Sequence, residues 1–199
     1  MDDLVRAALR KWPNVPACYG WLALDARGDW WMRDDATQAR GPFPAAKGSR
    51  IQHDKLLGFI ARNYAVDSSG AWFFQNGPQR VYVTLEAAPR VWRLGQNGDQ
   101  KGHVLSHLTL NLGRHPGLDD APVNALSTVL DEDGRLYAQL AFAQEESAWG
   151  VVHPQDLWTA SQWLEQGVWP QPQEMSLAAL AQHAGFVRAP QPGRVPLTG

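Results

Sequence analysis

The sequence predicts an α+β protein, mainly antiparallel β-sheet with three to four packing helices. Three observations predict this class: many short segments with apolar residues at every second position, a few segments with helical spacing, and turn-forming residues between them. The chain has 199 residues, of which 44% are apolar and 19% charged, as is typical of one folded domain. We therefore expect a single globular unit over residues 1–199.

The first half of the chain is expected to combine two helices with several strands. Residues 3–12 place apolar side chains on one helical face, and Pro13 ends that segment. A loop rich in Gly and Pro at 41–48 precedes a second helix from about 53 to 64. Strands are expected at 18–24, 29–32, 71–75, 80–85 and 90–94, and Asn76-Gly77 suits the tight hairpin turn between the third and the fourth.

The second half is expected to hold more strands and two closing helices. Pro154 suits the first position of a helix and Gly167 its stop, which predicts a helix from Pro154 to about Gln166. Ser176 as N-cap and Gly185 as stop predict the last helix. Strands are expected at 104–112, 123–130, 135–142 and 149–152, with polar loops at 96–102 and 113–122.

One pattern occurs three times, at residues 24–31, 66–73 and 130–137. Each copy reads apolar residue, Asp, two variable residues, Gly, one residue, then two large apolar or aromatic residues. An Asp carboxylate at the start of a turn accepts backbone N–H groups, and Gly adopts the left-handed conformation. The pattern therefore predicts three β-turns. A calcium loop is excluded because it needs more acidic ligands at alternating positions before its glycine.

The first and third copies of this pattern share a further feature. Each is followed by a histidine and then a predicted helix, at His53 and at His153. This spacing indicates two related halves, with sub-units at 14–100 and 103–187 and a loose tail at 188–199.

Composition and charge exclude several classes of protein. The net charge is −2, so no global field attracts nucleic acid or anionic lipid. The N-terminus has no cationic start followed by an apolar run, and no stretch of 18 apolar residues exists. Cys18 is the only cysteine, whereas secreted proteins more often carry an even set. We expect a cytoplasmic protein that binds neither nucleic acid nor membrane, and the sequence leaves its oligomeric state open.

No residue pattern in the sequence indicates a metal site, a cofactor or a catalytic centre. His103 and His107 fall on one predicted strand about 13 Å apart, which is too far for one zinc ion. His115 lies in the next loop without a Cys or acidic partner at suitable spacing. His53-Asp54 reads as a helix start, and Cys18 as a buried thiol. The sequence contains neither a G-x-S-x-G elbow nor a phosphate-binding glycine loop.

The most distinctive stretch runs from Trp72 to Glu86 and contains a rigid turn tipped with amide groups and a guanidinium. Ten tryptophans in the chain predict a Trp-rich core, with an aromatic recognition surface as the alternative. Arg80, Arg90 and Arg93 lie on adjacent segments, and each offers bidentate geometry to an anion. The predicted ligand-binding residues are Trp72, Gln75, Asn76, Gln79, Arg80 and Arg90.

Residues 72–86, together with Gly28-Asp29-Trp30-Trp31-Met32-Arg33-Asp34 and Gly41-Pro42-Phe43-Pro44, resemble an uncharacterised bacterial family of about this length. The similarity covers most of residues 19–190. This family has no assigned activity, so the resemblance implies no catalytic residue. The chain also looks distantly similar to another unassigned bacterial family with a repeated α+β unit. That likeness favours the duplication and a binding or signalling role.

These observations predict a non-catalytic binding module for a small anionic ligand or a protein segment. Two other functions stay open. One is a hydrolase-type enzyme with a site assembled from distant His and Asp residues, because catalytic groups need only spatial proximity. The other is a structural, oligomer-forming protein.

Overall fold

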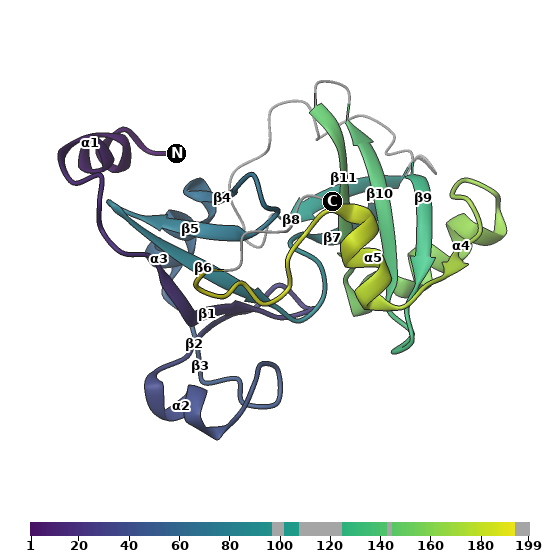
Figure 1. Cartoon of the computed structure of the whole chain (residues 1–199). Coiled ribbons are helices and arrows are strands. Elements are labelled where there is room, and N and C mark those ends of the chain that lie inside the picture. The colour runs from purple at the N-terminus through teal and green to yellow at the C-terminus, as the bar shows by residue number, and fades with distance from the viewer. Residues whose placement is uncertain (97–101, 108–124, 143–144, 194–199) are drawn as a thin grey trace. The chain divides into compact units, whose positions relative to one another are not determined.

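A computed structural model describes residues 1–96, 102–107, 125–142 and 145–193 (Figure 1). The α+β class is confirmed, since the described ranges hold two mixed, mostly antiparallel sheets and five α-helices. The chain forms two compact units. Unit 1 comprises Met1–Asp25, Asp29–Ala87 and Gly185–Gly199, and unit 2 comprises Ala26–Gly28 and Ala88–Ala184.

Unit 1 is built on a sheet with the strand order β3-β2-β1-β6-β5-β4. Its neighbouring strands are antiparallel except β1 and β6, which are parallel. Its elements are α1 (Asp3–Lys11), β1 (Cys18–Leu24), β2 (Trp30–Met32), α2 (Asp35–Arg40), β3 (Ser49–Arg50), α3 (Asp54–Arg62), β4 (Tyr64–Val66), β5 (Trp72–Asn76) and β6 (Gln79–Leu85).

Helix α3 shows how the unit 1 sheet is covered on one face. His53 precedes the helix, and its Nδ1 accepts the N–H of Leu56 at 3.3 Å, which caps the helix start. Ile60 is 1% exposed, and Phe59 meets Phe74 of β5 edge to face at 5.3 Å. Helix α2 is too short to give a periodic signal, and the sequence did not predict it. Its N-cap is Asp34.

Unit 2 is built on a sheet with the order β12-β9-β10-β11-β7-β8. Strands β11 and β7 are parallel, as are β12 and β9, and the other neighbours are antiparallel. Its elements are β7 (Val91–Gln96), β8 (Gly102–His107), β9 (Ala125–Leu130), β10 (Leu136–Phe142), β11 (Glu145–Val152), the 3₁₀ turn η1 (Pro154–Asp156), α4 (Leu157–Glu165), β12 (Gln173–Glu174) and α5 (Leu177–Ala184).

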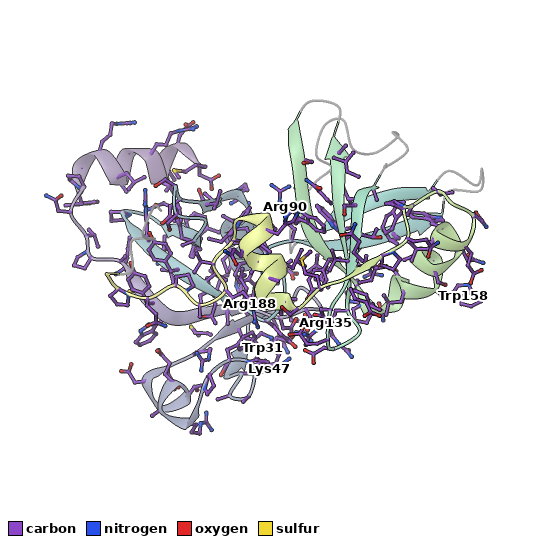
Figure 2. The ribbon with its side chains drawn as sticks, turned by 45° about the vertical axis from the view of Figure 1, so that its right-hand side comes forward. Trp31, Lys47, Arg90, Arg135, Trp158 and Arg188 are labelled. Atoms are coloured by element: carbon purple, nitrogen blue, oxygen red, sulfur yellow. The ribbon has the colours of Figure 1, made fainter. Side chains whose placement is uncertain are left out.

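Tryptophan fills much of the core of unit 2. Trp92 and Trp169 are each 1% exposed, and Trp163 meets Trp169 at 5.1 Å between ring centroids. The Trp92 indole also donates to the carbonyl of Ala138 at 2.9 Å, so its polar edge is satisfied inside the core. Trp158 on α4 is different, since it is 74% exposed and projects from the helix (Figure 2).

The two sheets share one connectivity. Unit 1 contains the spatial order β4-β5-β6-β1-β2, and unit 2 contains β9-β10-β11-β7-β8, with a parallel pair at the same place in each. This match supports the hypothesis of two related halves, which stays a prediction. In the matching strand orders, the turn after β4 is equivalent to the turn after β9. The second and third copies of the sequence pattern therefore occupy equivalent positions in the two sheets.

Some predicted features lie outside the described residues. These are most of the loop at 96–102, the strand end at 108–112, the turn at 113–122 with His115, and residues 194–199 of the tail. His103 and His107 belong to β8, but the structure does not describe their side chains. None of the helices in the described ranges has the length and apolar character needed to cross a bilayer.

Candidate ligand-binding cavity

The three predicted Asp turns are confirmed, and they share one geometry. In each, one carboxylate oxygen accepts the backbone N–H of the residue four positions on, and the Asp N–H donates to the carbonyl of that same residue. The glycine before that residue has positive φ. The carboxylate distances are 2.9 Å for Asp25 with Asp29, 3.1 Å for Asp67 with Ala71, and 2.8 Å for Asp131 with Arg135.

The second carboxylate oxygen of each turn accepts a hydrogen bond from an aromatic side chain. For Asp25 and Asp131 the donor lies six residues on, at Trp31 (3.0 Å) and Tyr137 (2.8 Å). In the Asp67 turn this position is a phenylalanine, Phe73, which has no donor. The donor is instead Tyr82 at 2.8 Å, the residue paired with Phe73 across β5 and β6. The repeated arrangement assigns these carboxylates a structural role in holding the turns.

In two of the three turns, a positively charged side chain forms an ion pair with the Asp carboxylate. Lys47 Nζ lies 3.1 Å from Asp25 Oδ2 and 5.0 Å from the centre of the Trp31 ring, beside which it is drawn in Figure 2. Arg135 Nη1 lies 3.6 Å from Asp131 Oδ2. Within the described chain, no lysine or arginine forms an ion pair with Asp67.

A cavity of about 330 Å³ adjoins the Asp67 turn in unit 1. Its aromatic wall is formed by Tyr19 of β1 and Tyr82 of β6, whose rings stack in parallel at 4.7 Å. The residues that line it are Tyr19, Asp67, Ser68, Ser69, Ala71, Tyr82, Val187, Ala189, Pro190, Gln191 and Gly193.

The C-terminal segment of unit 1 forms one side of this cavity. Val187 bridges to Ala71 in parallel, and its N–H donates to the carbonyl of Gly70 at 2.9 Å. The carbonyl of Arg188 accepts the N–H of Leu85 at 2.8 Å, and Pro190 is buried. The segment after α5 therefore returns along β6 (Figure 1). The sequence had assigned residues from 188 onward to a loose tail, and the first part of that tail packs against the sheet.

The ionisation of the cavity wall follows from these contacts. Burial alone would raise the pKa of Asp67, but hydrogen bonds from Ser69, Tyr82 and Ala71 outweigh it and hold that pKa below its ordinary value. Burial raises the pKa of Tyr82, the hydrogen bond to Asp67 raises it further, and the nearby Arg80 guanidinium lowers it in part. At neutral pH the cavity wall therefore presents a carboxylate and a neutral phenol.

The predicted site residues divide between the two faces of the β5–β6 hairpin. Cross-strand partners share a face, so Gln75 and Arg80 lie on the face of Phe73 and Tyr82. Gln75 is 1% exposed, and its amide donates to the carbonyl of Gly77 at 3.0 Å, so it supports the turn. Trp72, Asn76 and Gln79 lie on the other face, where Trp72 packs on Tyr64 and Gln79 donates to Pro16.

The predicted arginine cluster is spread over both units. Arg80 belongs to unit 1, is exposed, and lies with its guanidinium 4.5 Å from the centre of the Phe73 ring. Arg90 and Arg93 belong to unit 2. Arg93 forms an ion pair with Asp156 at 2.6 Å, so that guanidinium already holds an anion of the chain. Arg80 belongs to the same unit as the cavity and lies two residues before the lining residue Tyr82 on β6.

The histidines with described side chains take up local roles. His153 caps η1 in the same way as His53 caps α3, since its Nδ1 accepts the N–H of Gln155 at 3.1 Å. His183 lies edge to face with Trp149. Among the described residues, no group of three or more metal-binding side chains gathers at one point.

Comparisons with known proteins point to families without an assigned activity. A family model, DUF2944, described as "Protein of unknown function (DUF2946)", matches residues 1–191 and confirms the resemblance to an uncharacterised family. A search of curated proteins found no match. Among solved structures, a DUF1285 family protein from Shewanella baltica is 16% identical, with a TM-score of 0.43 over 71% of this chain and 91% of that one. A DUF1285 family protein from Silicibacter pomeroyi is 11% identical, with a TM-score of 0.43 over 81% and 84%.

Proposed function

We propose that this chain, which belongs to the DUF2944 family of proteins of unknown function, is a non-catalytic module that binds a small ligand in the unit 1 cavity. The observation that carries the proposal is the cavity itself, about 330 Å³ in volume and lined by stacked tyrosine rings, hydroxyl groups and a carboxylate. Sites for small molecules have volumes of roughly 300–1,000 Å³ and combine apolar walls with a few polar groups.

The chemistry of the wall supports binding without catalysis. A general acid or base works best when its pKa lies near the working pH. The pKa of Asp67 lies below its ordinary value and that of Tyr82 above, so both move away from neutrality. The Ser69 hydroxyl donates to Asp67 at 2.6 Å, but a carboxylate of lowered pKa is too weak a base to activate it as a nucleophile.

Arg80 supports an anionic group on the ligand. Its guanidinium lies 4.5 Å from the centre of the Phe73 ring and the residue is exposed, so its N–H groups can bind a carboxylate or phosphate in bidentate fashion. It lies on β6 two residues before Tyr82, which lines the cavity, and on the same face of the strand. The anionic ligand predicted from the sequence is therefore retained in the proposal, with Arg80 as the residue that binds it.

A thermal-shift screen of small metabolites against a blocked variant tests this proposal. Ser68 is exposed and lines the cavity, so Ser68→Trp puts an indole into the space where the ligand would bind. The control is Gln52→Trp, at an exposed position of unit 1 outside the lining. We expect compounds that raise the melting temperature of the wild type and of Gln52→Trp to lose that effect on Ser68→Trp. Hits that Ser68→Trp leaves unchanged would contradict the proposal.

The alternative functions predict different experimental results. A protein segment as the ligand would be released by Arg80→Ala in pull-down experiments while the metabolite screen stays silent. A hydrolase would turn over a panel of model esters and phosphates, and an oligomer-forming protein would scatter light as a stable assembly. A cytoplasmic location belongs to the proposal as well, and the single cysteine supports it.

A further inference from the structure

The three Asp turns differ in what meets the second carboxylate oxygen besides the aromatic donor. In the Asp25 turn it is Lys47, and in the Asp131 turn it is Arg135. A carboxylate removed from water is strongly stabilised by a cation at hydrogen-bond distance. In the Asp67 turn the cavity takes the place of the cation.

The groups that face Asp67 favour a positive charge in that space. They are Ser68 and Ser69 of its own turn, Tyr82 of β6 with Tyr19 stacked on it, and the apolar Val187 of the C-terminal segment. Among the described residues that line the cavity, Asp67 carries the one formal charge. Tyrosine rings attract cations to their faces, so the aromatic wall adds to the pull of the carboxylate.

A negative and a positive side chain, Asp67 and Arg80, both lie close to Tyr82 at this site. The Tyr82 hydroxyl donates to Asp67 at 2.8 Å, and Arg80 lies two residues before Tyr82 on the same face of β6, with its guanidinium 4.5 Å from the centre of the Phe73 ring. Residues two positions apart on a strand are separated by about 7 Å. A small molecule with an ammonium group and a carboxylate on the same carbon fits such a pair of charges, with its ammonium group at Asp67 and its carboxylate at Arg80.

We infer that the ligand is a small zwitterion, of which α-amino acids are the simplest class, bound through its ammonium group by Asp67 and through its carboxylate by Arg80. The inference rests on the proposed function and names the ligand class for the same cavity. The apolar lining of Ala71, Val187 and Ala189 leaves room for a small aliphatic side chain, which favours amino acids of that kind over charged ones.

Calorimetric titration of the full chain with matched compounds tests the inference. The series is L-alanine and L-valine, the same molecules without the amine (propanoate and 3-methylbutanoate), and their amides without the carboxylate. In the wild type, removal of the amine is expected to weaken binding about tenfold or more, as for a lost charge-assisted hydrogen bond. This comparison needs no variant, so it does not depend on whether a variant folds.

Asp67→Asn gives the second comparison, because the amide keeps the size of the side chain and an oxygen for the turn N–H groups. The amino acids are expected to bind this variant about as weakly as the amine-free acids bind the wild type. The matched control is Asp131→Asn, which neutralises the corresponding turn of unit 2 and should leave the ratio of the two affinities unchanged. Circular dichroism and urea unfolding of both variants verify their folds.

Several results would overturn the inference. It falls if amine-free acids bind as tightly as the amino acids, if Asp67→Asn keeps the preference for the amine, or if no member of the series binds. The proposed function is judged separately by the blocked cavity. When screen hits of another class still depend on an open cavity at Ser68, the binding function stands and the zwitterion is refuted.

Discussion

The hydroxyl groups of Tyr137 and Tyr82 allow one atom to be removed from two corresponding turns. Each hydroxyl donates to the second oxygen of its turn carboxylate at 2.8 Å. Tyr137 is 0% exposed and the Asp131 side chain is fully enclosed, whereas Tyr82 lines a cavity that opens to solvent. Tyr137→Phe and Tyr82→Phe therefore make the same chemical change in a closed and in an open site.

The expected cost follows from whether water can replace the lost donor. A hydrogen bond to a charged group contributes about 1.5–3 kcal/mol, and a buried acceptor left without a donor keeps its full desolvation cost. Tyr137→Phe is therefore expected to lower the free energy of unfolding by about 2–3 kcal/mol. Water can occupy the cavity beside Asp67, so Tyr82→Phe is expected to cost about 1 kcal/mol or less.

Hydrogen exchange at increasing urea concentration, read on peptides from each unit, measures both costs separately. Peptides of β9 and β10 report on Tyr137→Phe, and peptides of β5 and β6 report on Tyr82→Phe. An equal or larger cost for Tyr82→Phe would refute the reasoning, because it would mean that solvent does not reach the Asp67 carboxylate.

Three further predictions concern packing and pH. Lys47→Met removes the Lys47 ammonium group from the Asp25 carboxylate and is expected to lower the free energy of unfolding by about 1–3 kcal/mol in a urea experiment, while Lys55→Met at an exposed position of α3 should cost under about 0.5 kcal/mol. Gly150→Ala puts a methyl group against the buried Trp92 ring and is expected to lower the free energy of unfolding by about 1–3 kcal/mol in the same experiment, and unchanged stability would contradict this. The pKa of Asp25 is lowered, because hydrogen bonds from Asp29, Trp31 and Lys47 outweigh the opposing effect of burial. The contribution of the Asp25 carboxylate to folding stability is therefore fully present above its unfolded pKa of about 3.9 and is lost as pH falls through its folded pKa. In urea unfolding measured across pH, Asp25→Asn should reduce the loss of stability on the acid side.

The features that the sequence predicted are those governed by neighbouring residues. The Asp-to-Gly turns form because a carboxylate, a backbone N–H and a left-handed glycine all lie within five positions of one another. The last helix begins where Ser176 was expected to cap it, since the Ser176 hydroxyl accepts the N–H of Ala179 at 3.2 Å. The hairpin at Asn76-Gly77 follows the same logic, with Gly77 at positive φ.

The cavity depends on contacts between distant segments, which local patterns do not encode. Tyr19, Asp67 and Val187 come together through the parallel pairing of β1 with β6 and the return of the C-terminal segment to Ala71. The hydrogen bond from Tyr82 to Asp67 could have been predicted from the sequence. The hairpin register places Tyr82 opposite Phe73, so a donor for Asp67 follows once the phenylalanine is seen to lack one.

The split of the predicted site has the same origin. Alternation along a strand sends successive side chains to opposite faces, so a run of polar residues at a hairpin does not form one surface. Gln75 and Arg80 share the face of the cavity, while Asn76 and Gln79 do not. Arg90 was grouped with Arg80 by closeness in sequence, but the boundary between the two units falls between them.

The central claim is that the unit 1 cavity binds a ligand whose ammonium group meets Asp67. The most direct measurement is two-dimensional amide NMR of the full chain, before and after addition of millimolar L-alanine and L-valine, in the wild type and in Asp67→Asn. The account predicts saturable shifts at Ser68, Ser69, Ala71 and Val187 in the wild type, and their loss in the variant. Unchanged spectra in the wild type, or equal shifts in both proteins, would contradict it.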